Sequence, residues 1–216
     1  MCSRRYEEGG LELGLSAEAL AKVEAWGLSK RAVFLDRDGT LNVDVGYLHR
    51  LEDLELFPWT TDALRLLKRA GYTLIVVTNQ SGIAHGLIDP GFVQICHDEM
   101  RRRLQGGGAD LDALYYCKHH PGGSVKEFSV DCRCRKPLPG MVDDAVRDLG
   151  VDPKQSWVIG DKWLDVNLGH AVGAKSILVR TGWGAEQEQR RPKGQQVDAV
   201  CDNLIHAVSV ILHGLH

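Results

Sequence analysis

Short runs of apolar residues recur along the chain, and stretches long enough for a helix separate them. The runs occupy residues 32–35, 72–77, 111–116, 157–159, 176–179 and 198–200. Because they are continuous rather than alternating with polar residues, they favour strands that are covered on both faces, as in a parallel sheet. The helices expected between them lie at 60–70, 90–105, 139–149, 163–172 and 202–213. Regular alternation of strand and helix predicts a doubly wound α/β fold with a mainly parallel sheet.

Three segments depart from this alternation. Residues 1–30 are expected to form an N-terminal extension with an extra helix at 16–27, and residues 31–216 to form one domain, which is the usual content of a chain of this length. Residues 117–138 form a long loop without periodicity, and such loops are usually functional. The polar stretch 184–196 is expected to be a solvated surface loop.

The first helix of the domain carries signals at both ends. Thr60 or Thr61 is expected to cap its N-terminus, because a side-chain oxygen there can accept a hydrogen bond from a free backbone N–H group. Gly71 follows its other end, where a glycine with a left-handed backbone commonly terminates a helix. Together the two signals favour a helix at 60–70.

The composition argues against several classes of partner. The formal net charge is −3, so nothing predicts binding to nucleic acid or to an anionic membrane. The sequence contains no run of about 18 apolar residues, which is the length needed to span a bilayer. The polar N-terminus does not resemble a signal peptide. We expect a cytoplasmic monomer whose partner is a small molecule. In that compartment Cys96 and Cys201 are expected to pack as small apolar residues.

Polar side chains with complementary chemistry follow the expected strands. Asp36 to Thr40 come after the first strand, Thr78 to Gly82 after the second, and Asp161 to Asp165 after the fourth. The pair Arg135-Lys136 precedes the third expected helix. In a doubly wound fold, ligands bind where the carboxyl ends of the strands meet. We therefore expect these four segments to form one site.

This set of groups is chemically complete for phosphoryl transfer. A phosphate monoester dianion repels nucleophiles, so a metal ion and a cation must neutralise its charge. A carboxylate nucleophile divides hydrolysis into two displacements through an aspartyl phosphate. A second carboxylate can protonate the leaving alcohol and then deprotonate water. Hydroxyl and backbone N–H groups can hold the phosphoryl oxygens, and Mg²⁺ prefers oxygen ligands.

The run Asp36-Arg37-Asp38-Gly39-Thr40 resembles the signature of the haloacid dehalogenase superfamily of phosphatases. More narrowly, the chain resembles the D-glycero-D-manno-heptose 1,7-bisphosphate 7-phosphatase and histidinol-phosphatase branch. An isolated Asp-x-Asp also occurs in turns and helix caps, so the specificity comes from the combination of motifs. The matching stretches are Leu35 to Asn42, Gly46 to His49, Val76 to Gly82, Tyr115 to Cys117, His119 to Pro121, Cys132 to Pro137 and Ile159 to Lys162.

The resemblance implies roles for the carboxylates. Asp36 would be the nucleophile and a Mg²⁺ ligand. Asp38 would be the general acid and base, and its backbone carbonyl would also bind Mg²⁺. Asp161 would be the remaining carboxylate on Mg²⁺, directly or through water. Asp165 matches a neighbouring acidic position, and it belongs either to the metal shell or to a helix face.

The resemblance also implies how the substrate is bound. Thr78 and Asn79 would bind the transferring phosphoryl group, and Lys136 would neutralise its charge. The insertions are too short for a separate cap domain, so loops would cover the substrate. We expect these to be residues 43–50, residues 83–89 and the long loop at 117–138.

Three side chains bear on the choice of substrate. Arg135 could contact a second anionic group, and Tyr47 and His49 could contact hydroxyl groups, which favours a heptose bisphosphate. Histidinol phosphate is the alternative within the same branch. A mutase of the same superfamily is a further alternative, although it needs a cap that excludes water. A zinc-loop interaction module without enzymatic activity is the remaining hypothesis.

The long loop carries three cysteines beside histidines. Cys117, Cys132 and Cys134, with His119 or His120, would provide three sulfurs and one nitrogen for a tetrahedral Zn²⁺ site. The resemblance favours His119. Because the loop has no secondary structure of its own, we expect zinc to cross-link it structurally and so to position the adjacent Arg135-Lys136 pair.

Overall fold

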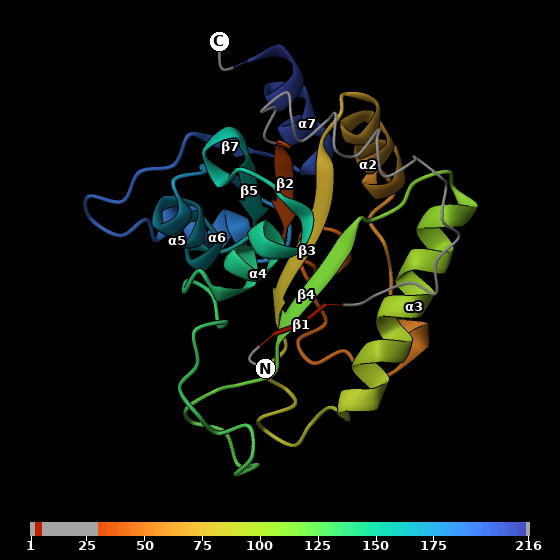
Figure 1. Ribbon diagram of the computed structural model, residues 1–216, viewed down its shortest axis with the longest axis vertical. Coiled ribbons are helices and arrows are strands. Elements are labelled where there is room, and N and C mark those ends of the chain that lie inside the picture. Colours follow the sequence, from red (N-terminus) through yellow and green to blue (C-terminus); the bar gives the residue numbers. More distant parts are fainter. Residues whose placement is uncertain (1–2, 6–29, 215–216) are drawn as a thin grey trace.

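A seven-stranded sheet forms the centre of the molecule (Figure 1), in the order β1-β4-β3-β2-β5-β6-β7. The computed structural model describes residues 3–5 and 30–214. Neighbouring strands pair in parallel, except that β1 runs antiparallel to β4. The strands are β1 (Ser3–Arg5), β2 (Ala32–Leu35), β3 (Thr73–Asn79), β4 (Ala113–Cys117), β5 (Trp157–Gly160), β6 (Lys175–Val179) and β7 (Ala199–Cys201). The six expected strands are confirmed, with small shifts at their ends.

Helices cover both faces of the sheet (Figure 1). Alternate side chains of β2 point to opposite faces: Val33 and Leu35 pack in one apolar cluster with α2, α3 and α7, while Phe34 packs in another with α4 and α5. This two-sided burial explains why the strands read as continuous apolar runs, and it confirms the doubly wound fold. The helices are α2 (Thr60–Arg69), α3 (Pro90–Gly106), α4 (Gly140–Leu149), α5 (Trp163–Val172), α6 (Gly184–Gln189) and α7 (Leu204–His213).

The strand order fixes where a ligand can bind. From β2 the chain builds outward through β3 to β4, and β5 then returns to the other side of β2 and continues outward to β7. The carboxyl ends of β2 and β5 thus flank the point where the strand order reverses, which is the usual ligand site of such sheets. Asp36 and Asp161 directly follow these two strands, and the Asp36 N–H donates to the Ile159 carbonyl across 2.9 Å.

Two elements depart from the sequence-based expectation. The stretch expected to be a solvated loop, 184–196, contains helix α6, although its remainder is irregular. Only Gly184 of this helix is buried, so no apolar periodicity marks it; its Ala, Glu and Gln residues favour helix, and Glu186 pairs with Arg190 across 2.7 Å. Strand β1 was not expected either, because it pairs at the sheet edge through its backbone.

Helix α2 ends as expected but begins differently. Gly71 follows it with φ +82°, as a terminating glycine requires. The expected threonine cap is wrong, because the N-cap is Trp59 and no side chain bonds the free N–H groups there. Thr60 is the first helical residue, and its buried hydroxyl donates instead to the Leu41 carbonyl across 2.7 Å. The loop after β2 is thereby attached to α2.

The connections after β2 and β3 at the carboxyl edge of the sheet contain little regular structure. Between β2 and α2 the chain forms one 3-10 turn, Leu51–Asp53, and residues 80–89 between β3 and α3 contain no helix or strand. The described residues therefore form no separate cap domain, as expected. A second 3-10 turn, Pro153–Gln155, precedes β5. No described helix has the length and apolar character needed to cross a bilayer.

The helix expected at 16–27 lies outside the described residues. The division of the chain into an extension, residues 1–30, and a domain, residues 31–216, therefore stays a prediction. Residues 3–5 of that extension nevertheless form β1 and pair with β4, at the edge of the same sheet.

Ser156 completes the hydrogen bonding at the start of the central strand. Its hydroxyl oxygen accepts from the Ala32 N–H across 2.8 Å and donates to the Asp152 carbonyl across 2.6 Å. Ser156→Ala should lower the free energy of unfolding by about 1–3 kcal/mol, because a buried N–H group loses its acceptor. Chemical denaturation measures this, with Ser209→Ala on the exposed side of α7 as the control. Equal stability of the two variants would contradict the prediction.

Candidate active site

A buried lysine joins two of the carboxylates at the carboxyl edge of the sheet. The Lys136 ammonium group lies 2.7 Å from Asp36 and 2.6 Å from Asp165, and the lysine is 3% exposed. Burial alone would lower the pKa of Lys136, but the charges of Asp165 and Asp36 outweigh it and raise that pKa. Lys136 is therefore a permanent cation beside the Asp36 carboxylate.

Three carboxylates form a compact group: Asp36, Asp161 and Asp165 each offer an oxygen within 4.8 Å of the others. Burial and the charge of Asp36 raise the pKa of Asp161 to about 8. Burial raises the pKa of Asp165 to about 6, although Lys136 opposes it. Oδ1 of Asp161 is buried and accepts no hydrogen bond from the described residues. Buried carboxylates that repel one another, with an oxygen unused, suit a bound divalent cation.

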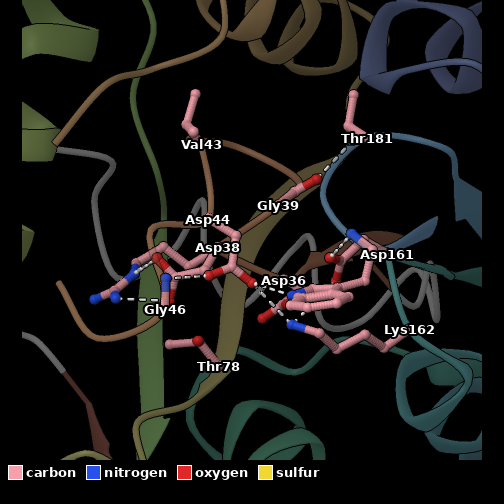
Figure 2. Close-up of polar contacts among 12 residues, drawn as sticks. Asp36, Asp38, Gly39, Val43, Asp44, Gly46, Thr78, Asp161, Lys162 and Thr181 are labelled. Atoms are coloured by element: carbon pink, nitrogen blue, oxygen red, sulfur yellow. Dashed lines mark hydrogen bonds and ion pairs between the residues drawn. The ribbon is translucent and has the colours of Figure 1, made fainter. Parts of the chain in front are cut away.

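Close glycine packing holds Asp161 in this group (Figure 2). A Cβ atom on Gly39 or on Gly182 would lie 2.3 Å from Oδ2 of Asp161, and both glycines have positive φ, at +82° and +56°. The same Oδ2 accepts from the Trp183 N–H across 2.9 Å, and the Thr181 hydroxyl donates to the Gly39 carbonyl across 2.6 Å. Only glycine permits the chain to approach this carboxylate so closely.

Asp38 lies beside this group but is bound differently. Its carboxylate accepts hydrogen bonds from Arg37 at 2.7 and 3.0 Å, from Asn42 at 3.0 Å and from Gln80 at 3.0 Å. Burial acts to raise the pKa of Asp38, but the charge of Arg37 and these hydrogen bonds outweigh it and lower that pKa. The side chain of Asp38 is not part of the three-carboxylate group. Its environment therefore differs sharply from that of Asp161.

The two phosphate-binding candidates after β3 have distinct contacts. The Asn79 side chain accepts from the Lys136 N–H across 3.0 Å and donates to the Lys136 carbonyl across 3.2 Å. In this structure its amide thus fixes the lysine backbone, which the sequence did not indicate. The Thr78 hydroxyl oxygen accepts from the Gln80 amide across 3.0 Å. A hydroxyl that already accepts one bond keeps its proton available for donation.

The long loop brings together the four residues named as zinc ligands. Ligand atoms of Cys117, His119, Cys132 and Cys134 lie within 4.8 Å of one another. His119 Nδ1 is 3.5 Å from the Cys134 sulfur, and the sulfurs of Cys132 and Cys134 are 3.4 Å apart. Hydrogen bonding to Cys134 contributes most to lowering the pKa of the Cys117 thiol, to about 6. Three sulfurs and one nitrogen in this arrangement can enclose a metal ion.

The alternative ligand, His120, faces elsewhere. Its ring packs against that of His85 with centroids 4.8 Å apart, and its Nδ1 accepts from the Gly122 N–H across 3.1 Å. Arg135 bonds another part of the same long loop, because its guanidinium donates to the His119 carbonyl across 3.3 Å. Cys96 and Cys201, in contrast, are buried at 1% and 0% exposure, as expected for packed thiols.

The three loops expected to cover the substrate contact one another. The ring of Tyr47 meets that of His85 edge-on at 6.4 Å, and His85 in turn meets His120. The Ser124 N–H donates to the Ala84 carbonyl across 2.8 Å, joining the second loop to the third. Tyr47 remains 42% exposed. The Nδ1 atom of His49 donates to the Tyr47 carbonyl across 2.8 Å, and His49 lies at the exposed rim.

Sequence reasoning missed a second ion-pair network beside Asp161. Lys162 lies 3.7 Å from Asp161 and 3.1 Å from Asp44, and Asp44 also accepts from the Trp183 indole N–H across 3.0 Å (Figure 2). Lys162 directly follows Asp161 in the stretch Ile159 to Lys162, and this position in the sequence was a signal for it. Asp44 and Trp183 had no such signal, because their contact joins residues 139 positions apart in sequence.

Comparison with known proteins finds relatives along most of the chain. A family model described as HAD-hydrolase-like matches residues 133–207. The D-glycero-β-D-manno-heptose-1,7-bisphosphate 7-phosphatase of Yersinia pestis is 47% identical over 153 residues, covering 70% of this chain and 81% of that protein. The protein of the same name from Escherichia coli K12 is 48% identical over 153 residues, covering 70% of this chain and 80% of that one.

A solved structure agrees with these relatives. The D,D-heptose 1,7-bisphosphate phosphatase of B. bronchiseptica, complexed with magnesium and phosphate, is 32% identical and superposes with a TM-score of 0.74, covering 85% of this chain and 98% of that one. Identity at this level over this length shows common family membership, beyond a shared fold. The chain is therefore a phosphatase of the haloacid dehalogenase superfamily and belongs to the branch of the heptose bisphosphate 7-phosphatases.

Proposed function

We propose that this enzyme hydrolyses D-glycero-β-D-manno-heptose 1,7-bisphosphate to the 1-phosphate through an aspartyl phosphate. The observation that carries the proposal is the family relationship: relatives bearing this name are 40–48% identical to the chain over 70–85% of its length. The carboxylates and the lysine named from the sequence also lie together at one edge of the sheet.

In the first displacement Asp36 attacks the phosphorus atom. Lys136 lies 2.7 Å from the nucleophile and can neutralise charge on the phosphoryl oxygens as they approach. Because Lys136 also pairs with Asp165, its ammonium group stays in place when Asp36 turns toward the substrate. The Thr78 hydroxyl, whose acceptor side is held by Gln80, donates its proton to a phosphoryl oxygen.

Asp38 moves the protons. It donates a proton to the oxygen of the leaving alcohol, and in the second displacement it accepts one from the water that attacks the aspartyl phosphate. The second step requires an ionised carboxylate, and the lowered pKa of Asp38 provides that form. The first step requires a proton on Asp38, so one of its four hydrogen bonds must be released when the substrate binds.

The residues present fit a Mg²⁺ ion. The support is the group of three buried carboxylates, in which Asp161 has an oxygen without a hydrogen bond. Asp36, Asp161 and the backbone carbonyl of Asp38 would hold the ion, and Asp165 would contact it or orient its waters. Bound Mg²⁺ would neutralise the phosphate charge and lower the pKa of its neighbours Asp161 and Asp165.

Zn²⁺ is the ion that we assign to the loop. Three thiols and an imidazole are the donors typical of structural zinc, and four protein ligands would leave no position for a substrate. The last of these ligands, Cys134, is two residues before Lys136, and Arg135 between them bonds the His119 carbonyl. Zinc would therefore act by ordering the loop that delivers Lys136 to Asp36.

The loops around the site support a bisphosphate. Arg135 adds a second cation close to Lys136 along the chain, and Tyr47 lies exposed at the rim, where it can meet hydroxyl groups. The cytoplasmic location and the monomeric state expected from the sequence stay predictions.

A substrate panel tests the function. We expect kcat/KM for phosphate release to be highest with the β anomer of heptose 1,7-bisphosphate, and at least about tenfold lower with the α anomer, histidinol phosphate and fructose 1,6-bisphosphate, since a binding difference of about 1.4 kcal/mol is tenfold. Asp36→Asn should abolish turnover of every ester while the circular dichroism spectrum is unchanged. A preference for histidinol phosphate would overturn the substrate, and an active Asp36→Asn variant would overturn the nucleophile.

Metal analysis tests the loop. The purified enzyme should hold one zinc per chain, and Cys134→Ser should lose it, together with hydrogen-exchange protection of the long loop and most of kcat, because zinc binding supplies the loop's ordering energy. Cys201→Ala, which removes a buried thiol outside the group, is the matched control and should keep its zinc. Full activity and loop protection after removal of zinc would contradict its structural role.

A further inference from the structure

A buried polar network lies behind Asp38, and none of its members touches the reacting atoms in the proposed mechanism. It contains Arg37, Gln80 and His97, which are 2%, 4% and 0% exposed. Two of these residues come from the loops after β2 and β3, and His97 lies on α3. Burying a polar group costs free energy unless the group is hydrogen-bonded, so a buried network of this kind points to a role.

Arg37 fixes the orientation of the Asp38 carboxylate. Its Nε donates to Oδ1 across 3.0 Å and its Nη2 donates to Oδ2 across 2.7 Å, so that the two planar groups face each other. Such a paired contact restrains rotation of the carboxylate in a way that a single hydrogen bond does not. Arg37 itself is buried, and its remaining N–H groups therefore need acceptors.

His97 is the acceptor at the far end of the guanidinium. Its Nε2 lies 3.1 Å from Arg37 Nη1, and because a guanidinium only donates, the histidine nitrogen must accept. The ring is consequently neutral, in accord with a pKa held well below the usual value by burial and by the Arg37 charge. Its ring also meets Tyr116 edge-on at 5.4 Å, which limits its own movement.

Gln80 links the acid/base residue to the phosphate-binding hydroxyl. Its Oε1 accepts from Arg37 Nη2 across 3.0 Å, which determines which way the amide faces. Its Nε2 then donates to Asp38 Oδ2 and to the Thr78 hydroxyl, each across 3.0 Å. One amide thus sets the distance between Asp38 and the group that would hold the phosphoryl oxygens.

We propose that Arg37, Gln80 and His97 are positioning residues for Asp38, with His97 acting through Arg37 to hold the carboxylate where it meets the leaving oxygen. The inference rests on the proposed role of Asp38 as general acid and base. Its consequence concerns the leaving group. An alkoxide leaves poorly without a proton, whereas p-nitrophenolate is a stable anion that leaves without one. Loss of positioning should therefore slow the first displacement more for a sugar phosphate than for p-nitrophenyl phosphate, whereas the second displacement is common to both esters.

The experiment compares two esters in full-length enzyme with its metals bound. With the best sugar phosphate substrate, His97→Leu should lower the rate constant of the first displacement, measured in single turnovers, by about ten- to a hundredfold, a part of the 10²–10⁴-fold that general acid–base catalysis supplies, and leave KM within about twofold. With p-nitrophenyl phosphate the loss should be at least about tenfold smaller. His97→Gln, which restores a neutral acceptor, should recover most of that rate constant, and His170→Leu on the exposed side of α5 is the surface control.

An equal loss on both esters, no loss on either, or a change confined to KM would overturn the inference. Asp38→Asn is the reference, because it should show the same selectivity with a larger loss. If it affects neither ester, the acid/base role and the inference both fail. If it is selective and His97→Leu is not, the inference alone fails. If His97→Leu does not fold, Arg37→Lys replaces it and is judged by the same comparison of the two esters, because it keeps the charge and loses the paired contact.

Discussion

The ion pairs of Lys136 are the interactions on which the rest of this site depends. A buried ammonium group is stable only beside opposite charge, and Asp36 and Asp165 provide that charge at 2.7 and 2.6 Å. The dependence is mutual, because these carboxylates lie in a group with Asp161 that repels itself unless cations are present. The loop that carries Lys136 is held in turn by Asn79, which bonds its backbone on both sides.

The fold brings these charges together by its strand order. Because β2 and β5 are neighbours although about 120 residues apart, the carboxylates that follow them meet at one point of the sheet edge. Glycines then permit the final approach: Gly39 and Gly182 leave room for Asp161 that any side chain would fill. Around Asp38 the same edge is organised by hydrogen bonds from Arg37. One edge thus supports two electrostatic environments, in which the pKa of Asp161 is raised and that of Asp38 is lowered.

Much of the fold could be predicted because it follows from local pattern. Strands buried on both faces are mostly apolar, so β2 to β7 were recognisable as apolar runs. Helices α2 to α5 lie between these strands, and α7 follows the last one. The errors lie where apolar pattern gives no signal. Helix α6 buries only Gly184 among its residues, β1 is a three-residue strand at the sheet edge, and Thr60 bonds the Leu41 carbonyl instead of capping its helix. For β1 and Thr60 the deciding contact is with a distant part of the chain, and for α6 the local sequence carries no apolar periodicity.

The sequence by itself determined the doubly wound fold, the run that contains Asp36 and Asp38, and the set of cysteines and histidines on the long loop, because each is a matter of residue type at fixed spacing. Only the tertiary structure decided between His119 and His120, turned the Asn79 side chain onto the Lys136 backbone, and joined Asp165 to the lysine. It also brought His97 from α3 to Arg37, and Trp183 to Asp44. These contacts link residues far apart in the chain, and their geometry exists only once the sheet is assembled.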